Sequence, residues 1–160
     1  MPRTQTTTTE TKSPSPDALA LLKADHELVQ DLFDKFQKAR TDKQKATLAE
    51  QICTELTIHA QIEEEIFYPA VREAIEDDDL MDEADVEHAG AKDLIAQIEA
   101  SDPGEDHFDA KVTVLGEYVK HHVEEEQSEM FPKVRKAELD LNELGSEMRA
   151  RKDELLAEMA

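Results

Sequence analysis

Two stretches of the chain, IHAQIEEEIFYP at residues 58–69 and HHVEEEQSEMFP at residues 121–132, follow nearly the same pattern. In each stretch a histidine precedes a glutamate by four residues and a proline by ten; the histidine–glutamate pairs are His59/Glu63 and His122/Glu126. A spacing of four places two side chains one turn apart on the same face of a helix. An acidic chain supplies one such pair by chance, but the same proline and aromatic residue would hardly follow it twice. The repeat therefore predicts two equivalent helices.

The composition of the chain favours a helical protein. Its 160 residues include only 4 Gly and 6 Pro, and 36% of them are charged. The alternation of β-branched and aromatic residues that marks strands is not visible. The 39 acidic residues outnumber the 18 basic ones, which gives a net charge of −21. Such a chain repels phosphate backbones and anionic membranes, so we expect neither nucleic acid nor a membrane as a partner.

Cysteine usage and the N-terminal segment bear on the compartment. The single cysteine, Cys53, cannot form an internal disulfide, which fits a reducing environment. No apolar run approaches the ~18 residues of a membrane span. Residues 1–16 are rich in Thr, Ser and Pro and lack the apolar core of a secretory signal, so we expect a disordered tail there. These features predict a cytoplasmic protein.

Helix start and stop signals organise the rest of the chain. Ser15 is the expected N-cap of a first helix, with Pro16 at its first position and Asp17 in its first turn. Further helices are expected at about residues 43–76, 80–100, 107 to beyond 132, and 141–159. The short connections predict an all-α fold: an up-down-up-down four-helix bundle over residues 17–139 and an extra C-terminal helix within 140–160.

Each of the first four helices places one histidine in its apolar stripe, and the two repeated helices also place a glutamate there; the six residues are His26, His59, Glu63, His88, His122 and Glu126. A buried carboxylate costs several kcal/mol unless it is paired or coordinates a cation. An ordinary bundle whose histidines are satisfied by neighbouring acids is the structural alternative, and it explains one such residue better than six. His107 is expected on the surface, whereas His121, about 100° around the helix from His122, competes for a site role.

The spacing of the histidines indicates how the six side chains meet. His26 and His59 are 59 − 26 = 33 residues apart, and His88 and His122 are 122 − 88 = 34 apart. The chain thus reads as two similar hairpins, which suggests two equivalent metal ions bridged by the glutamates. Imidazole with carboxylate suits iron, manganese or zinc, and six ligands shared by two octahedral ions favour iron. Four further glutamates next to the predicted ligands are expected to be exposed charge; they are Glu64, Glu65, Glu124 and Glu125.

Four segments in this order, ADHELVQDLF, IHAQIEEEIFYP, VEHAGAKDLI and HHVEEEQSEMFP, resemble the hemerythrin-like HHE cation-binding domain. The resemblance covers about residues 17–139. It implies a four-helix bundle around a non-haem di-iron centre with an oxo or hydroxo bridge. It also implies that the six residues above are the iron ligands, with Glu63 and Glu126 bridging the two ions.

One position departs from the oxygen-carrying hemerythrins, which have a second histidine on the third helix where this chain has Lys92. One iron would then have an open position, or Tyr118 or His121 would complete it. The resemblance implies a protein that binds oxygen or nitric oxide for transport, storage or sensing. The alternative is a di-iron enzyme that acts on peroxide or nitric oxide in a stress response. A helical protein that binds no metal, or that binds a partner through its last helix, is the third hypothesis.

Overall fold

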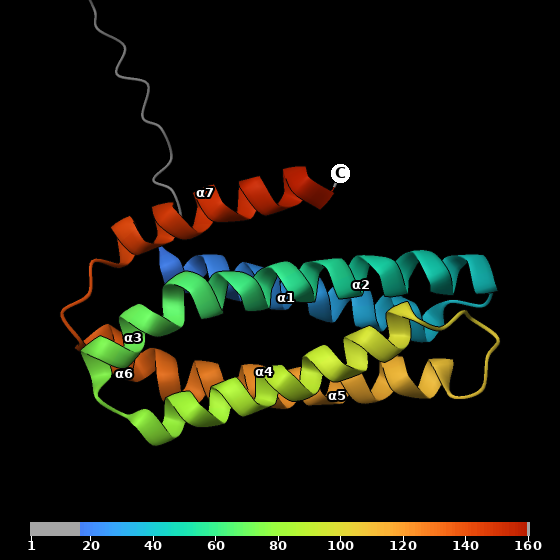
Figure 1. Ribbon diagram of the computed structural model, residues 1–160, viewed down its shortest axis with the longest axis horizontal. Coiled ribbons are helices and arrows are strands. Elements are labelled where there is room, and N and C mark those ends of the chain that lie inside the picture. The colour runs from blue at the N-terminus through green and yellow to red at the C-terminus, as the bar shows by residue number, and fades with distance from the viewer. Residues whose placement is uncertain (1–16, 160) are drawn as a thin grey trace, which may run out of the picture.

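The structure, a computed structural model, describes residues 17–159. All secondary-structure elements in that range are helices. Four long helices run antiparallel in an up-down-up-down bundle (Figure 1): α1 (Ala18–Lys38), α2 (Asp42–Ile62), α4 (Asp78–Glu99) and α5 (Phe108–Glu125). The predicted all-α fold is therefore confirmed, while the predicted disordered tail at residues 1–16 lies outside the described residues.

Two of the long helices continue beyond a single wide turn. Helix α2 passes through the π-helical turn η1 (Glu63–Phe67) into α3 (Tyr68–Ile75), and α5 passes through η2 (Glu126–Met130) into α6 (Phe131–Lys136). Each π turn begins at the glutamate of a repeated stretch, because the backbone N–H of Tyr68 donates to the Glu63 carbonyl five residues earlier and Phe131 donates likewise to Glu126.

The repeated prolines account for these wide turns. A proline inside a helix has no N–H to donate, and its ring clashes with the carbonyl four residues before it. Pro69 and Pro132 stand six residues after Glu63 and Glu126 and follow the π turns directly. One extra residue in the turn moves the carbonyls away from the ring, so the helix continues where a regular one would break. Turns of this kind occur frequently at functional sites.

Short polar side chains cap three of the four bundle helices, whereas His107, the N-cap residue of α5, makes no side-chain cap. Asp17 is the N-cap of α1, and its Oδ1 accepts a hydrogen bond from the Ala20 N–H at 2.8 Å. The prediction of Ser15 as N-cap with Asp17 inside the first turn was therefore wrong by two residues, because the aspartate supplies the stronger local acceptor. Thr41 forms a capping box with Gln44 at the start of α2. Asp77 caps α4 by accepting from the Leu80 N–H at 3.2 Å.

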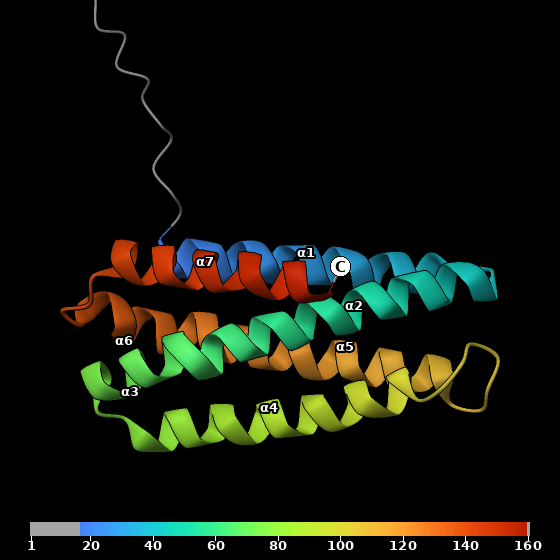
Figure 2. The ribbon, with the colours of Figure 1, turned by 45° about the horizontal axis from the view of Figure 1, so that its top comes forward.

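The interior of the bundle has two apolar clusters with a polar layer between them. One cluster lies near α3 and α6 and includes Phe67 and Phe131; the other lies nearer the opposite end and includes Phe33 and Phe108. The buried polar and charged side chains come from the helical turns that lie between the two clusters; they are Asp25, His26, His59, Glu63, His88 and Glu126. Figure 2 shows the four bundle helices running past one another at this level.

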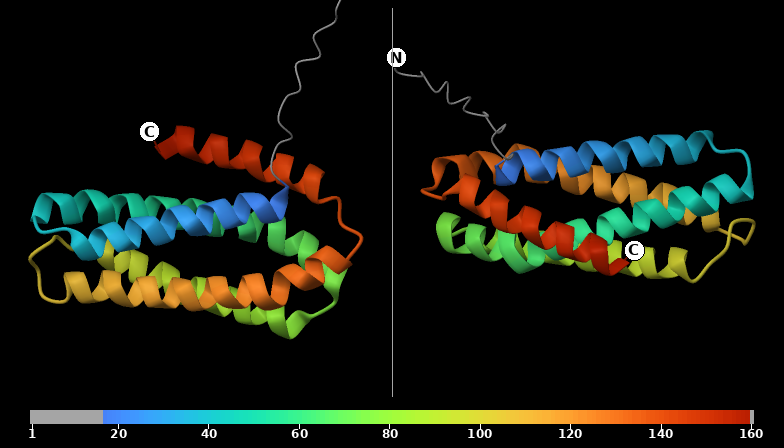
Figure 3. Two further views of the ribbon diagram at one scale, coloured as in Figure 1. Left: turned by 180° about the vertical axis from the view of Figure 1, so that it is seen from behind. Right: turned by 90° about the horizontal axis from the view of Figure 1, so that it is seen from above.

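A further helix, α7 (Leu141–Met159), lies across α1 and α2 on the side away from α4 and α5 (Figure 3). It buries Leu144, Met148 and Leu155 in the apolar cluster near α3 and α6. Arg151 adds an ion pair to Glu65 at 2.8 Å. In the described part of the chain, no helix combines the length and apolarity that crossing a membrane requires.

Candidate metal centre

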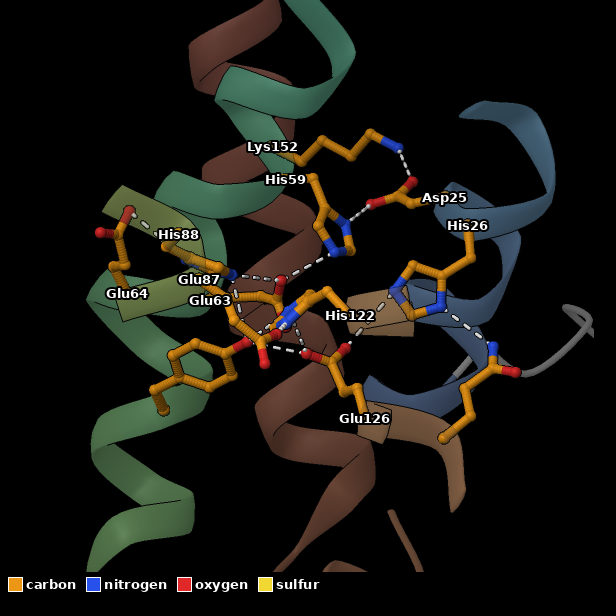
Figure 4. A network of polar contacts seen from close by, with 12 residues as sticks. Asp25, His26, His59, Glu63, Glu64, Glu87, His88, His122, Glu126 and Lys152 are labelled. Carbon is orange, nitrogen blue, oxygen red and sulfur yellow. Dashed lines mark hydrogen bonds and ion pairs between the residues drawn. The ribbon is translucent and has the colours of Figure 1, made fainter. Parts of the chain in front are cut away.

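The six side chains singled out by the sequence converge on one point inside the bundle (Figure 4). Their donor atoms form two groups in which every atom lies within 4.8 Å of the others: His26, His59 and Glu126 in one, and Glu63, His88 and His122 in the other. Donors on opposite sides of a cation with bonds of ~2.1 Å are about 4.2 Å apart. Each group is therefore compact enough to hold one cation after small adjustments.

Each group takes two histidines from one hairpin and its glutamate from the other. The carboxylate of Glu63 reaches both groups, since its Oε1 lies 2.8 Å from His59 Nε2 and 3.4 Å from His88 Nε2. Glu126 does the same: Oε1 lies 3.4 Å from His26 Nε2, and Oε2 lies 3.2 Å from His122 Nε2. Both glutamates thus stand where a carboxylate would bridge two cations.

Several of these atoms have no hydrogen-bond partner among the described residues, although they are buried; they are His26 Nε2, both oxygens of Glu63, His88 Nδ1 and Glu126 Oε1. Buried polar atoms are nearly always paired, and a buried carboxylate without a partner is costly. His59 Nε2 lies 2.8 Å from Glu63 Oε1, so a proton on that nitrogen would pair the two groups in the metal-free protein. The remaining buried atoms face one another without partners, as expected for the ligands of a cation. The residues present fit a metal centre.

A tyrosine hydroxyl also enters the centre. Tyr68 donates a hydrogen bond to Glu126 Oε2 at 2.7 Å, and its oxygen lies 3.2 Å from the Nε2 atoms of both His88 and His122. Burial, together with the negative charges of Glu126 and Glu63, raises the pKa of Tyr68 well above its usual range. Tyr68 is therefore a neutral donor in the metal-free protein, and its hydroxyl is a seventh polar group, beside the group that contains His88 and His122.

The outer nitrogens of three histidines are held by partners outside this set. His59 Nδ1 lies 3.0 Å from Asp25 Oδ2, and His122 Nδ1 makes a short contact with Glu87 Oε2. Gln127 Nε2 lies 3.0 Å from His26 Nδ1. Asp25 and Glu87 accept from Nδ1–H, which fixes the tautomer of each imidazole and leaves Nε2 free for a cation. The amide nitrogen of Gln127 is a donor, so it positions the ring of His26 but does not fix that tautomer.

The acids of the centre hold protons on its histidines when no metal competes. Although burial lowers the pKa of His122, the hydrogen bonds to Glu126 and Glu87 and the charges of Glu126 and Glu63 raise it to about 9. His59 behaves alike: burial opposes its charge, but Glu63 and Asp25 raise its pKa well above 6.5. A cation would displace these protons, because a ligating imidazole must be neutral.

Asp25 stays ionised in spite of its burial. Desolvation alone would raise its pKa, but the bond to His59 and the ammonium of Lys152 lower it below 3.8. No lysine or arginine of the described residues pairs with Glu87, which lies close to the side chains of His121 and His122. Its neighbour is the carboxyl of Glu125, whose pKa is raised by the hydrogen bond to Glu87.

The structure brings together all six residues that the sequence indicated, but neither residue considered for the open position. His121 is 68% exposed at its side chain and pairs with Glu125 at 3.2 Å. Tyr118 is exposed, and its hydroxyl lies over Gly90 of α4. Lys92 turns outward to Glu64, with Nζ 2.5 Å from Oε1. The position is instead approached by Tyr68.

Sequence reasoning missed five residues that touch or support the centre: Asp25, Tyr68, Glu87, Gln127 and Lys152. A signal for two of them was present, because an acid directly precedes the histidine in both ADH at 24–26 and VEH at 86–88. The expectation that Glu64 and Glu65 are merely exposed charge was incomplete. Glu64 is half-buried against Lys92, and Glu65 holds Arg151 of α7.

An apolar cavity of about 210 Å³ opens onto the centre between α2, α4 and α5. Its floor is formed by His26, His59, Glu63, His88 and His122, and Val29, Leu56, Ile95 and Val119 line its walls. Ala60, Ala91 and Ala96 also line it, and their small side chains leave the space free. A benzene molecule fills a dry engineered cavity of about 150 Å³, so a small uncharged molecule fits here.

Comparison with known proteins agrees with this geometry. The family model of the hemerythrin HHE cation binding domain matches residues 17–134. The chain belongs to this family. A crystal structure of a hemerythrin HHE cation binding domain-containing protein from Mycobacterium kansasii superimposes with a TM-score of 0.75 and 26% identity, over 88% of this chain and 87% of that one. The resemblance noted in the sequence is thereby confirmed.

A DNA nickase from Nostoc sp. is 33% identical over 115 residues, which are 72% of this chain and 32% of the nickase. The chain therefore spans about a third of that relative. The HHE domain match and the His/Glu groups support cation binding by this chain.

Proposed function

We propose that this protein holds two iron ions at its six converging side chains and binds oxygen or a related small ligand there, for binding, storage or sensing. The observation that carries the proposal is the buried set of donor atoms without hydrogen-bond partners, with a carboxylate in reach of both groups. Iron in such a site supplies reversible electron transfer to a diatomic ligand, which zinc cannot. Glu63 and Glu126 bridge the two ions, and the four histidines complete their ligands.

The cavity supports an uncharged ligand. Its walls are largely aliphatic, which favours an uncharged molecule over one that must give up its hydration to enter. Dioxygen and nitric oxide carry no charge and fit the volume. Lys92, at the cavity wall, is drawn to Glu64 and away from the centre. The protein thus excludes bulk water by apolar packing and leaves an approach to the ions through the cavity.

A second candidate function is an enzyme that acts on peroxide or nitric oxide in a stress response. The observation that favours it is Tyr68, whose hydroxyl holds a proton 2.7 Å from Glu126 inside the centre. A hydroxyl in this position could donate a proton during reduction of a small ligand, or hold that ligand by a hydrogen bond. The same hydroxyl is the nearest oxygen for completing the ligand set beside His88 and His122.

The nickase relative does not alter this proposal. The matched region is a third of that protein, and the net charge of −21 opposes binding to nucleic acid. We propose the cytoplasm as the site of action. Its reducing conditions suit the lone Cys53, whose pKa burial and Glu99 raise to about 12, so that it is no reactive thiolate.

Anaerobic loading with iron(II) tests the proposal directly. We expect about two irons per chain, and an absorption change on adding oxygen that reverses when oxygen is removed. Irreversible bleaching at the first exposure would contradict reversible binding. Sustained oxygen release from hydrogen peroxide, faster than with free iron and lost in Glu63→Ala, would establish the enzyme instead. A purified protein that takes up no iron would refute both.

A further inference from the structure

Helix α7 lies beyond the matched family domain, which ends at residue 134, yet one of its side chains reaches the support of the metal centre. Lys152 Nζ lies 2.6 Å from Asp25 Oδ1. The lysine side chain is 18% exposed and the aspartate side chain 7%. This ion pair is thus largely withdrawn from water, unlike an ordinary surface pair, and is screened less by salt.

Asp25 shares its two oxygens between α7 and the centre. Oδ1 accepts from Lys152, and Oδ2 lies 3.0 Å from His59 Nδ1. The chain Lys152–Asp25–His59 is visible in Figure 4 and connects the last helix to a candidate ligand through a single carboxylate. With Nδ1–H donated to Asp25, the Nε2 lone pair of His59 faces the cation position.

The other hairpin has no counterpart of this lysine among the described residues. Glu87 supports His122 in the same way as Asp25 supports His59, but its carboxyl lies beside that of Glu125. One position is therefore supported by a neutralised acid and the other by an acid with a second acid beside it.

We propose that Lys152 is a positioning residue of the centre, and that docking of α7 thereby sets the cation affinity of the position formed by His26, His59 and Glu126. The proposal rests on the metal centre of the proposed function but not on the identity of its ligand. Without the ammonium, Asp25 becomes a buried acid with one unpaired oxygen. It then turns toward water, and His59 loses its fixed orientation.

The docking of α7 offers a matched control. Arg151, the neighbouring residue, pairs with Glu65 at 2.8 Å and with Glu154 at 3.0 Å, but does not contact Asp25. Leu144, Met148 and Leu155 anchor the helix in either case. Arg151→Met therefore removes a cation from α7 and weakens docking without touching the Lys152–Asp25–His59 chain. Lys152→Met keeps the aliphatic stem and removes only the ammonium.

The experiment is titration of the full-length, metal-free protein with cobalt(II), followed by its visible absorption and by calorimetry. Loss of an outer partner lowers metal affinity about 10–100-fold. We expect Lys152→Met to show that loss at one of two positions and to leave the other unchanged. Arg151→Met should keep both affinities, and Lys152→Arg should restore the first.

Two comparisons decide the interpretation. In an Asp25→Asn background, Lys152→Met should have no further effect, because the chain is already broken. Equal losses in Lys152→Met and Arg151→Met, or unchanged affinity in Lys152→Met, would overturn the proposal while leaving the proposed function in place. A wild-type protein that binds two cobalt ions but no oxygen after iron loading would refute the proposed ligand and leave the role of Lys152 standing.

Discussion

The two hairpins of the bundle hold their histidines alike but surround them differently. In each, the residue before the first histidine, Asp25 or Glu87, supports Nδ1 of the second. Asp25 is then paired with a lysine of α7, whereas Glu87 has Glu125 beside it. A repeated motif thus supplies equal ligands without supplying equal electrostatic surroundings.

The two hairpins also differ at the residue five positions after Glu63 and Glu126. In the first hairpin it is Tyr68, whose hydroxyl enters the centre; in the second it is Phe131, which stacks on His26 at 6.3 Å between ring centroids. Both are brought to the centre by π turns of the same kind. The same π turn thus occurs in both hairpins, but only in the first does it bring a polar group, the Tyr68 hydroxyl, to the centre.

Removal of the metal should have the largest effect, because it affects both halves at once. Without cations, Glu63 and Glu126 stay buried with unpaired oxygens. A ligand at ~1,000 times its Kd stabilises the folded state by about 4 kcal/mol. We expect chelation to lower the melting temperature by ~10 °C or more in calorimetry. Equal melting of the two forms would show that no cation is held by the carboxylates.

The pH dependence of the metal-free protein should be smaller and should involve both hairpins. His122 has a pKa of about 9 in the folded chain against 6.5 unfolded, so its contribution is complete below pH 6.5 and is lost as the pH rises through 9. The shift corresponds to about 3 kcal/mol at most. The pKa of His59 is also raised, so its contribution to stability is likewise lost as the pH rises.

Urea unfolding of the chelated protein between pH 6.5 and 9.5 measures this loss. The metal-loaded protein should show little of it, because the cation has replaced the protons. A chelated protein that becomes more stable over this range would contradict the assignment of protonated, acid-paired histidines.

Neutralising the supporting acid separates the two hairpins. Asp25→Asn and Glu87→Gln should each weaken one cation position about 10–100-fold in a cobalt titration. Asp25→Asn should also lower the stability of the metal-free protein by about 1–3 kcal/mol, since Lys152 then remains partly buried without its acid. Glu87→Gln should cost less, because it relieves Glu125. Equal stability losses in Asp25→Asn and Glu87→Gln would mean that the electrostatic difference between the hairpins does not contribute to stability.

Sequence periodicity predicted the bundle and the six converging side chains, because both follow from local rules. A stripe repeating every three to four residues fixes which side of a helix is buried, and short connections fix antiparallel neighbours. His122 lies in its stripe and His121 beside it, and the side chain of the first is only 14% exposed while that of the second is 68% exposed, as that pattern requires. The assignment of these residues as ligands stays a prediction until metal is measured.

The supporting residues could not be predicted in the same way. On a regular helix Tyr68 would lie about 140° around from Glu63; only the π turn brings both to one side, and periodicity assumes a regular helix. Lys152 and Asp25 are 127 residues apart. Their contact depends on how α7 crosses the bundle, which no stripe or cap encodes.

The smallest effect is expected from Tyr68→Phe, which makes the first hairpin resemble the second at this position. The loss of one hydroxyl should change stability by about 1 kcal/mol, because the ring stays packed against Phe67 and His88. The absorption of the iron-loaded protein should change more clearly. A cation beside the hydroxyl lowers the pKa of Tyr68 and so favours the phenolate, the reverse of the metal-free state. The phenolate bound to iron absorbs at long wavelength, and Tyr68→Phe would remove that band. Tyr118→Phe is the matched control, since Tyr118 is exposed on α5 and should leave the spectrum unchanged. Identical spectra for wild type and Tyr68→Phe would place the hydroxyl in a hydrogen bond to Glu126 only, and the two cation positions would then differ through the surroundings of Asp25 and Glu87 alone.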